Sequence, residues 1–280
     1  NYLLDEVFLG TTTHGTPFDA APFVLPPGLH RLSWRSRDGA GNFEAPRVST
    51  VAVDAGSPLS SLGFQGPRVA VSTDSTIVGP LTRVSLASTD PAHLGVSAGV
   101  RDTVALIDQT PGSCGLDFAA APANPEGMSG SCGAPYYRTP FAVGAGAHVV
   151  SYLAVDRVLN AGPLMTASIA GDYTPPSASL AVSGSSMTDR LGRLILSTGS
   201  AVAVTGADPL SGGVAAGVGA VLYAFGGAPE AEVAGSSTVL SLSEGAYTLA
   251  IRARDRVENL GAVVSTGLIV DASPPAFGAA

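Results

Sequence analysis

The sequence predicts an all-β protein made of tandem β-sandwich domains arranged as a rod. Three observations support this fold class. The 280 residues include 35 Gly and 21 Pro, which divide the chain into short segments. Apolar and polar residues alternate along several segments, as in a β-strand with one buried face. One stretch of roughly thirty residues also recurs three times, which indicates repeated domains.

The repeated stretch reads GLHRLSWRSRDGAGN from Gly28, GAHVVSYLAVDRVLN from Gly146 and GAYTLAIRARDRVEN from Gly245. The first two copies are 118 positions apart, and the last two are 99 apart. The same offsets align two further columns, Asp54 with Asp172 and Asp271, and Pro58 with Pro176 and Pro275. Three copies that agree over this length predict three domains of one kind.

Each copy begins with an alternating strand. Positions 30, 32, 34 and 36 and their counterparts form the set that we expect to face a core. Trp34 belongs to this set, and burial of such a side chain contributes about 1.5–3 kcal/mol. His30 and His148 share a column with Tyr247, which predicts a structural corner in place of a catalytic histidine.

An Asp-x-x-x-Asn segment ends each of these strands. The three pairs are Asp38 with Asn42, Asp156 with Asn160, and Asp255 with Asn259. Short Asp and Asn side chains bond nearby backbone amides, so the segments are predicted to be structural turns. The alternative is a calcium loop. Calcium takes about six to eight oxygen ligands, and each turn supplies one carboxylate and one amide, so the turn is favoured.

Further matches lie upstream of the second and third copies. DPAHLGVSAGV from Asp90 parallels DPLSGGVAAGV from Asp208, again 118 positions apart. TRVSLAS and SAVAVTG precede these turns, and PLSSLGF and PPSASLAV read as first strands. About seven short strands per 100 residues are typical of an immunoglobulin-like sandwich. The predicted domains are 1–54 (partial, C-terminal strands only), 55–171, 172–271, and 272–280 as the start of a further domain or a donor strand.

The pattern resembles the tandem bacterial Ig-like domains of secreted and cell-surface proteins. SGGVAAGV, EGAYTLAIRARDRVENLG and the VDASPP junction carry the resemblance, which covers nearly the whole chain. The family turn is commonly Asp-x-x-Gly-Asn, and only DGAGN keeps the Gly. The resemblance implies the fold, and it implies roles such as stalks, adhesive arms, filament components or spacers beside carbohydrate-active enzymes. It supplies no catalytic residue.

The second domain contains an insertion. Asp108 and Gly146 are 38 positions apart, whereas the matching Gly226 and Gly245 are 19 apart. The additional residues hold Cys114 and Cys132, which predicts a disulfide worth about 3 kcal/mol and an oxidising compartment. Two free thiols or a metal pair are the alternatives. Tyr136 and Tyr137 follow the insertion and are a candidate partner surface, although a hairpin with no partner is favoured.

Composition excludes several functions. The net charge is −8 and all 14 basic residues are Arg, which argues against nucleic-acid binding and against Lys-based covalent chemistry. The longest apolar run, from Gly212 to Pro229, is too rich in Gly to predict a membrane span. No hydrolase, phosphate-binding or zinc motif is present, so no catalytic residue, metal ligand or cofactor is expected.

The leading hypothesis is therefore a non-catalytic, secreted or cell-surface structural protein, acting as a stalk, adhesin or filament component. The alternative is a set of accessory modules of a secreted carbohydrate-active enzyme. A receptor for a small ligand is a third class, and it would need an exposed aromatic platform near Tyr136.

The first domain aligns with the third from Val218 onward, so it lacks counterparts of the first two strands. Two explanations are open: the chain is a segment of a longer repetitive protein, or a neighbouring copy adds a strand to the open edge. The first is favoured, because residues 272–280 match only one strand. The expected partners are thus further Ig-like domains or neighbouring copies.

Overall fold

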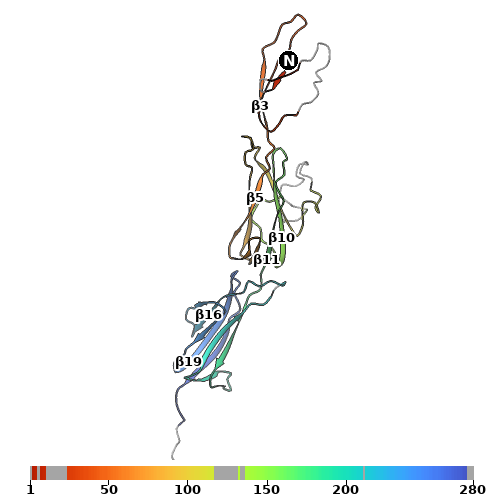
Figure 1. Ribbon diagram of the computed structural model, residues 1–280. Helices are drawn as coiled ribbons and strands as arrows, with labels where there is room; N and C mark the ends of the chain where they lie inside the picture. Colours follow the sequence, from red (N-terminus) through yellow and green to blue (C-terminus); the bar gives the residue numbers. More distant parts are fainter. Residues whose placement is uncertain are drawn as a thin grey trace, which may run out of the picture.

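The computed structural model describes residues 2–4, 7–10, 24–116, 132, 136–210 and 212–275. These residues form strands and turns and no helix, so the all-β prediction is confirmed. Figure 1 shows three β units that follow one another along the chain. No helix in the described part of the chain could span a bilayer.

The first unit is a single antiparallel sheet of order β2-β1-β3-β4. Its strands are β1 (Tyr2–Leu4), β2 (Val7–Gly10), β3 (Gly28–Trp34) and β4 (Arg47–Val53). β3 pairs with β4 from Gly28↔Val53 to Trp34↔Arg47. No second sheet faces it among the described residues, so one face of this sheet lacks the layer that a sandwich would provide.

The second unit is a β-sandwich of two sheets. β5 (Leu59–Gln65) pairs with β8 (Arg83–Thr89). The facing sheet has the order β6 (Arg68–Ser72), β7 (Ser75–Val78), β11 (Met165–Gly171), β10 (Gly146–Asp156) and β9 (Val100–Ile107). Val84 and Leu86 of the first sheet join Val150, Tyr152 and Ile169 of the second in one buried core.

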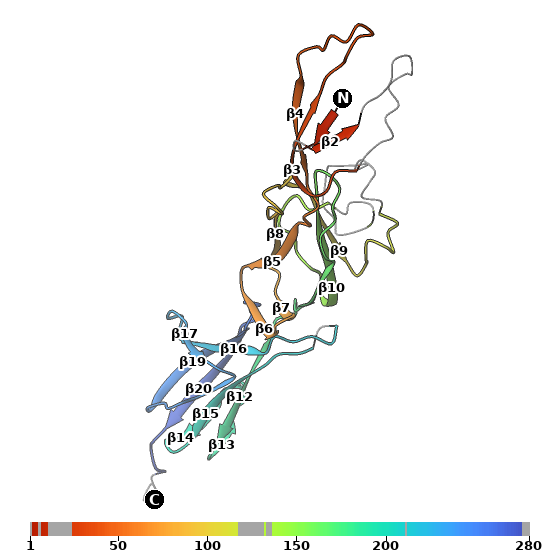
Figure 2. The same ribbon diagram turned by 45° about the horizontal axis from the view of Figure 1, so that its top comes forward.

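The third unit, which lies nearest the C-terminus in Figure 2, repeats this arrangement. Each of its two sheets has one strand more than the matching sheet of the second unit. One sheet contains β12 (Ser177–Ser183), β15 (Ala201–Ala207) and β18 (Ser237–Leu240). The other has the order β13 (Ser186–Thr188), β14 (Leu194–Ser197), β20 (Val264–Asp271), β19 (Gly245–Asp255), β16 (Val218–Phe225) and β17 (Ala231–Ala234). Val202, Val204, Leu249, Ile251 and Leu268 lie in its core.

The hairpins β6–β7 and β13–β14 are structure that the sequence pattern did not predict. In each unit the chain leaves the first strand and crosses to the other sheet, where β7 and β14 pair in parallel with β11 and β20. The crossing follows Gly66 (φ 104°) and Gly184 (φ 105°), which are 118 positions apart. Only Gly adopts such a φ without strain, so the two glycines mark the same turn.

The predicted burial of the repeated strand is correct in the second and third units and wrong at two positions of the first. Val150, Tyr152, Ala154, Leu249, Ile251 and Ala253 are buried, and His148 and Tyr247 are half-buried. In the first unit His30 is buried and Leu32 half-buried, but Trp34 is 37% exposed and Ser36 is exposed. The reason is that the described residues of this unit place no second sheet over β3.

Candidate functional site

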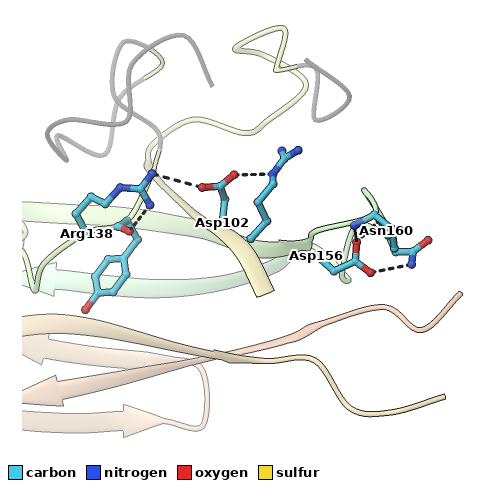
Figure 3. Close-up of polar contacts among 7 residues, drawn as sticks. Asp102, Arg138, Asp156 and Asn160 are labelled. Atoms are coloured by element: carbon cyan, nitrogen blue, oxygen red, sulfur yellow. Dashed lines mark hydrogen bonds and ion pairs between the residues drawn. The ribbon is translucent and has the colours of Figure 1, made fainter. Parts of the chain in front are cut away.

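The Asp-x-x-x-Asn segments form the expected turns. In the second unit the Asp156 carboxylate accepts the backbone N–H groups of Val158 (2.9 Å) and Asn160 (2.8 Å), and the Asn160 amide donates to it at 2.8 Å (Figure 3). Asp255 and Asn259 repeat these bonds in the third unit, at 2.8 Å and 2.7 Å. The Asp therefore caps the turn that follows its strand.

The Asn side chains of the second and third turns also reach the preceding unit. Asn160 Nδ2 donates to the backbone oxygen of Asp54 at 3.1 Å, and Asn259 Nδ2 donates to that of Asp172 at 2.9 Å. Asp54 and Asp172 directly follow β4 and β11, the last strands of the first and second units. Each Asn therefore holds the end of one unit against the start of the next.

The junction aspartates return the contact with their side chains. Asp54 Oδ2 accepts the backbone N–H of Ala98 at 2.6 Å, and Asp172 Oδ2 accepts that of Ala216 at 2.7 Å. Each donor lies 44 positions after its acceptor and belongs to a Gly-Val turn seen in the sequence. Asp54 and Asp172 share one column of the repeat, and each forms these two kinds of hydrogen bond across its junction. We call each such set of contacts a junction clasp.

A third aspartate lies beside each clasp. Asp90 Oδ2 accepts the N–H of Gly99 at 2.7 Å, and Asp208 Oδ2 accepts the N–H of Gly217 at 2.7 Å. The other oxygen, Oδ1, exposes less than 1 Å² in both residues and has no hydrogen-bond partner. A buried acceptor without a donor is costly, by about 1–3 kcal/mol and more if it is charged.

The folded chain gathers these carboxylates into two clusters of three, which we call the carboxylate triads. One triad contains Asp54, Asp90 and Asp156, and the other contains Asp172, Asp208 and Asp255. Within each, one oxygen per residue lies within 4.8 Å of the others. Asp156, Asp172 and Asp255 are at most 1% exposed.

Electrostatics at the second triad reflect this crowding. Burial raises the pKa of Asp255, against hydrogen bonds from Asn259 and Val257. Burial also raises the pKa of Asp208, and the nearby charges of Asp172 and Asp255 raise it further. Like charges that share a buried site disfavour ionisation, so the triad favours either a proton or a cation among its oxygens.

Sequence reasoning missed the triads because it counted the oxygens of each turn alone. Asp156 and Asp255 do supply one carboxylate each, but the fold adds two more from distant segments. The signal was present in the alignment, where Asp54 matches Asp172 and Asp90 matches Asp208. Three carboxylates with hard oxygen donors are a ligand set that suits a divalent cation such as calcium.

A disulfide and apolar contacts hold the insertion of the second unit in place. Cys114 and Cys132 form a disulfide with a Cα–Cα distance of 5.1 Å, as their spacing predicted. Cys114 and Leu116 pack on a second apolar cluster, on the outer face of the sheet that carries β9 and β10. That cluster consists of Val104, Leu106, Tyr136, Leu153 and Val155.

The candidate aromatic surface at Tyr136 and Tyr137 is corrected by the structure. Tyr136 is only 7% exposed, because its ring covers Val104 and Leu106 in the outer cluster. Tyr137 is half-buried against the main core and donates its N–H to Thr103 at 2.7 Å. Tyr136 therefore belongs to the cluster that contacts the insertion, whereas Tyr137 packs on the main core.

A buried carboxylate forms ion pairs with two arginines beside the same segment. Asp102 is 6% exposed and bonds Arg101 Nε at 2.8 Å and Arg138 Nη2 at 3.4 Å (Figure 3). Arg138 also lies over the Tyr136 ring, 5.6 Å from its centroid. The third unit has Ala220 in place of Asp102, so this anchor belongs to the unit with the insertion.

No protein-family model and no curated protein matches the chain. Among solved structures it is similar to the fibronectin(III)-like modules of Clostridium thermocellum CbhA, at 12% identity and a TM-score of 0.30, over 76% of this chain and 95% of that one. A 1.5-MDa bacterial ice-binding adhesin matches at 16% identity and 0.28, over 89% and 76%. The D00-D0 domain of intimin matches at 14% identity and 0.25, over 76% and 100%.

Proposed function

We propose that the chain is a non-catalytic structural segment of an extracellular protein, a stalk or filament component built of Ig-like repeats arranged as a rod. The observation that carries this proposal is the reciprocal clasp at each junction. Asn160 and Asn259 hold the preceding unit, while Asp54 and Asp172 hold the following one. Paired contacts of this kind restrict bending between neighbours, which a stalk needs.

The disulfide supports the extracellular location of the chain. Cys114 and Cys132 are the chain's two cysteines, and they are bonded to each other. Structural disulfides persist in oxidising surroundings such as the cell exterior. Immunogold labelling of intact cells tests the location, with surface label expected and a purely cytoplasmic signal contradicting it.

The mechanical role is tested by small-angle X-ray scattering on the intact chain. A rod gives a distance distribution with a long tail, whereas units folded back on one another give a compact one and would overturn the proposal. The non-catalytic part is tested by assaying the purified chain on peptides, esters and glycans. Turnover of any of these would refute it.

Neighbouring copies or further domains are the proposed partners of the first unit. Leu29 and Val48 of its sheet are 66% and 49% exposed, and Phe43, in the connection between β3 and β4, is 46% exposed. A strand added at its edge would pair open backbone groups, as in other strand-addition assemblies. The expected donor, residues 272–280, lies partly outside the described residues. Sedimentation velocity distinguishes the two cases, because self-association with rising concentration favours neighbouring copies.

The alternative function, as accessory modules of a carbohydrate-active enzyme, rests on one recess of about 450 Å³ in the third unit. Arg193, Phe225 and Tyr247 line it, and the two rings meet edge to face at 5.5 Å. Aromatic rings beside a polar group suit sugar contact. Affinity electrophoresis in polysaccharide gels separates the two functions, since retardation that Tyr247→Ala abolishes would favour the alternative.

A further inference from the structure

Both triads join groups from two sides of a junction. Asp172 follows the last strand of the second unit, whereas Asp208 and Asp255 come from the third. Asp54, Asp90 and Asp156 repeat this pattern one junction earlier. Any group that binds all three carboxylates therefore also links two consecutive units.

The charge in each triad has no ionic partner in the described part of the chain. None of the ion pairs found there includes any of the six aspartates. Backbone amides from Thr174, Ala216 and Gly217 bond individual oxygens, but they carry no full positive charge. The three carboxylates of each cluster are buried or half-buried, so they repel one another more strongly than they would in water.

The orphaned oxygens point to a missing ligand independently of the clustering. Oδ1 of Asp90 and Oδ1 of Asp208 are each buried to within 1 Å² and accept no bond. They occupy equivalent places in two units, whereas the second oxygen of each residue has a backbone partner. At each junction, a ligand supplied from outside the chain would satisfy the unpaired oxygen.

We propose that each carboxylate triad binds one calcium ion, which ties consecutive units together. Calcium accepts irregular arrangements of oxygen ligands at about 2.3–2.6 Å, and water completes its shell. Magnesium demands a near-ideal octahedron and is disfavoured by a site assembled from three separate segments. An affinity of about 10⁻⁴–10⁻³ M is expected, the range of extracellular calcium modules. Binding does not depend on the stalk role.

The test is isothermal titration calorimetry of the intact chain after treatment with EDTA. Two calcium ions should bind per chain, one at each triad. Asp90→Asn and Asp208→Asn should each remove one of them, and the double variant should bind none. Asn keeps an oxygen for the amide of Gly99 or Gly217 and lowers the charge, so both variants should fold.

Asp271→Asn is the matched control. Asp271 occupies the same repeat column as Asp54 and Asp172, yet it is exposed and bonds only the nearby N–H of Ser273 among the described residues. Its removal should leave both sites intact. The proposal fails if the wild-type chain takes up no calcium at millimolar concentration. It also fails if magnesium gives the same heat as calcium, or if the double variant still binds two ions.

Discussion

The third residue after the Asp differs in type among the three turns but has a positive φ in each of them. Gly41, Leu159 and Glu258 occupy this place, with φ of 95°, 77° and 71°. Gly adopts such angles freely, while other residues are strained there by about 1–2 kcal/mol. The second and third turns therefore hold strained residues beside the Asn that clasps the preceding unit.

Leu159→Gly should stabilise the second unit. Relief of the strain outweighs the extra chain entropy of Gly, which is about 0.5–1 kcal/mol, so a net gain of up to about 1 kcal/mol is expected. Leu159 is 41% exposed, which keeps the loss of packing small. Urea denaturation measures the change. Leu159→Ala keeps the positive φ and should show no gain, and an equal gain from both variants would contradict the strain argument.

The repeat column that holds His30, His148 and Tyr247 predicts that the stability of the fold depends on pH. His30, His148 and Tyr247 each bond a backbone oxygen three or four residues upstream, and His148 also bonds Asp108 at 2.7 Å. That bond, with the N–H of Val149, lowers the pKa of Asp108. The folded state thus holds the ionised carboxylate more strongly, so this stability is complete above pH 3.8 and is lost as the pH falls below it.

Asp108→Asn should therefore make unfolding less sensitive to acid. The variant loses the charged bond to His148, so its stability should fall less as the pH is lowered from 3.8 downward. Thermal melts across this pH range measure the slope. Glu244→Gln is the control in the third unit, because Glu244 is exposed and takes part in none of the ion pairs found among the described residues. A slope unchanged in Asp108→Asn would show that this bond does not contribute.

At the scale of the element, β10 and β19 are the same strand with different outer faces. Leu153 and Val155 of β10 are 4% and 0% exposed, whereas the matching Arg252 and Arg254 of β19 form ion pairs with Glu230, Glu232 and Glu258. The apolar pair of β10 is covered by the stapled insertion. A change of two residues therefore decides whether the sheet faces solvent or a second cluster.

Leu153→Arg should destabilise the second unit by about 3–5 kcal/mol, because it buries a charge without a partner. The reciprocal variant, Arg252→Leu, removes only a partly exposed ion pair and should cost less than about 1 kcal/mol. Chemical denaturation of the two variants gives the comparison. Equal costs would mean that the insertion does not seal the outer face of β10.

At the scale of the whole molecule, the two junctions differ in their packing. Val257 of the third unit is 0% exposed, and its oxygen lies 2.5 Å from the place where a Cβ on Gly79 would sit. Val158, the matching residue at the first junction, is 53% exposed. The triads and clasps are shared by both junctions, but close packing is found at the second.

Gly79→Ala should loosen the second junction without unfolding either sandwich. The added methyl group overlaps the backbone oxygen of Val257, so the two units must move apart. Spin labels on β9 and β16 should report a broader distance distribution. Gly199→Ala, where a Cβ meets nothing within 4 Å, is the control. An unchanged distribution in Gly79→Ala would exclude this contact as a restraint.

Local patterns were sufficient to predict several parts of the fold. The strands at 28–34, 146–156 and 245–255 followed from alternation, the turns from Asp and Asn, and the disulfide from an insertion that contains both cysteines. These features depend on neighbours in the chain or on period-two burial, and both are visible in one dimension. The domain boundaries stay predictions of the repeat.

By itself, then, the sequence determined the fold class, the repeated strand and turn, and the cysteine pair. Only the tertiary structure decided the rest. Trp34 is exposed because burial needs a second sheet, which no residue of its own strand can supply. Tyr136 is buried because Leu153 and Val155 lie beneath it. Asp54, Asp90 and Asp156 lie together because three distant segments converge, so carboxylates that are single along the chain become a cluster of three in space.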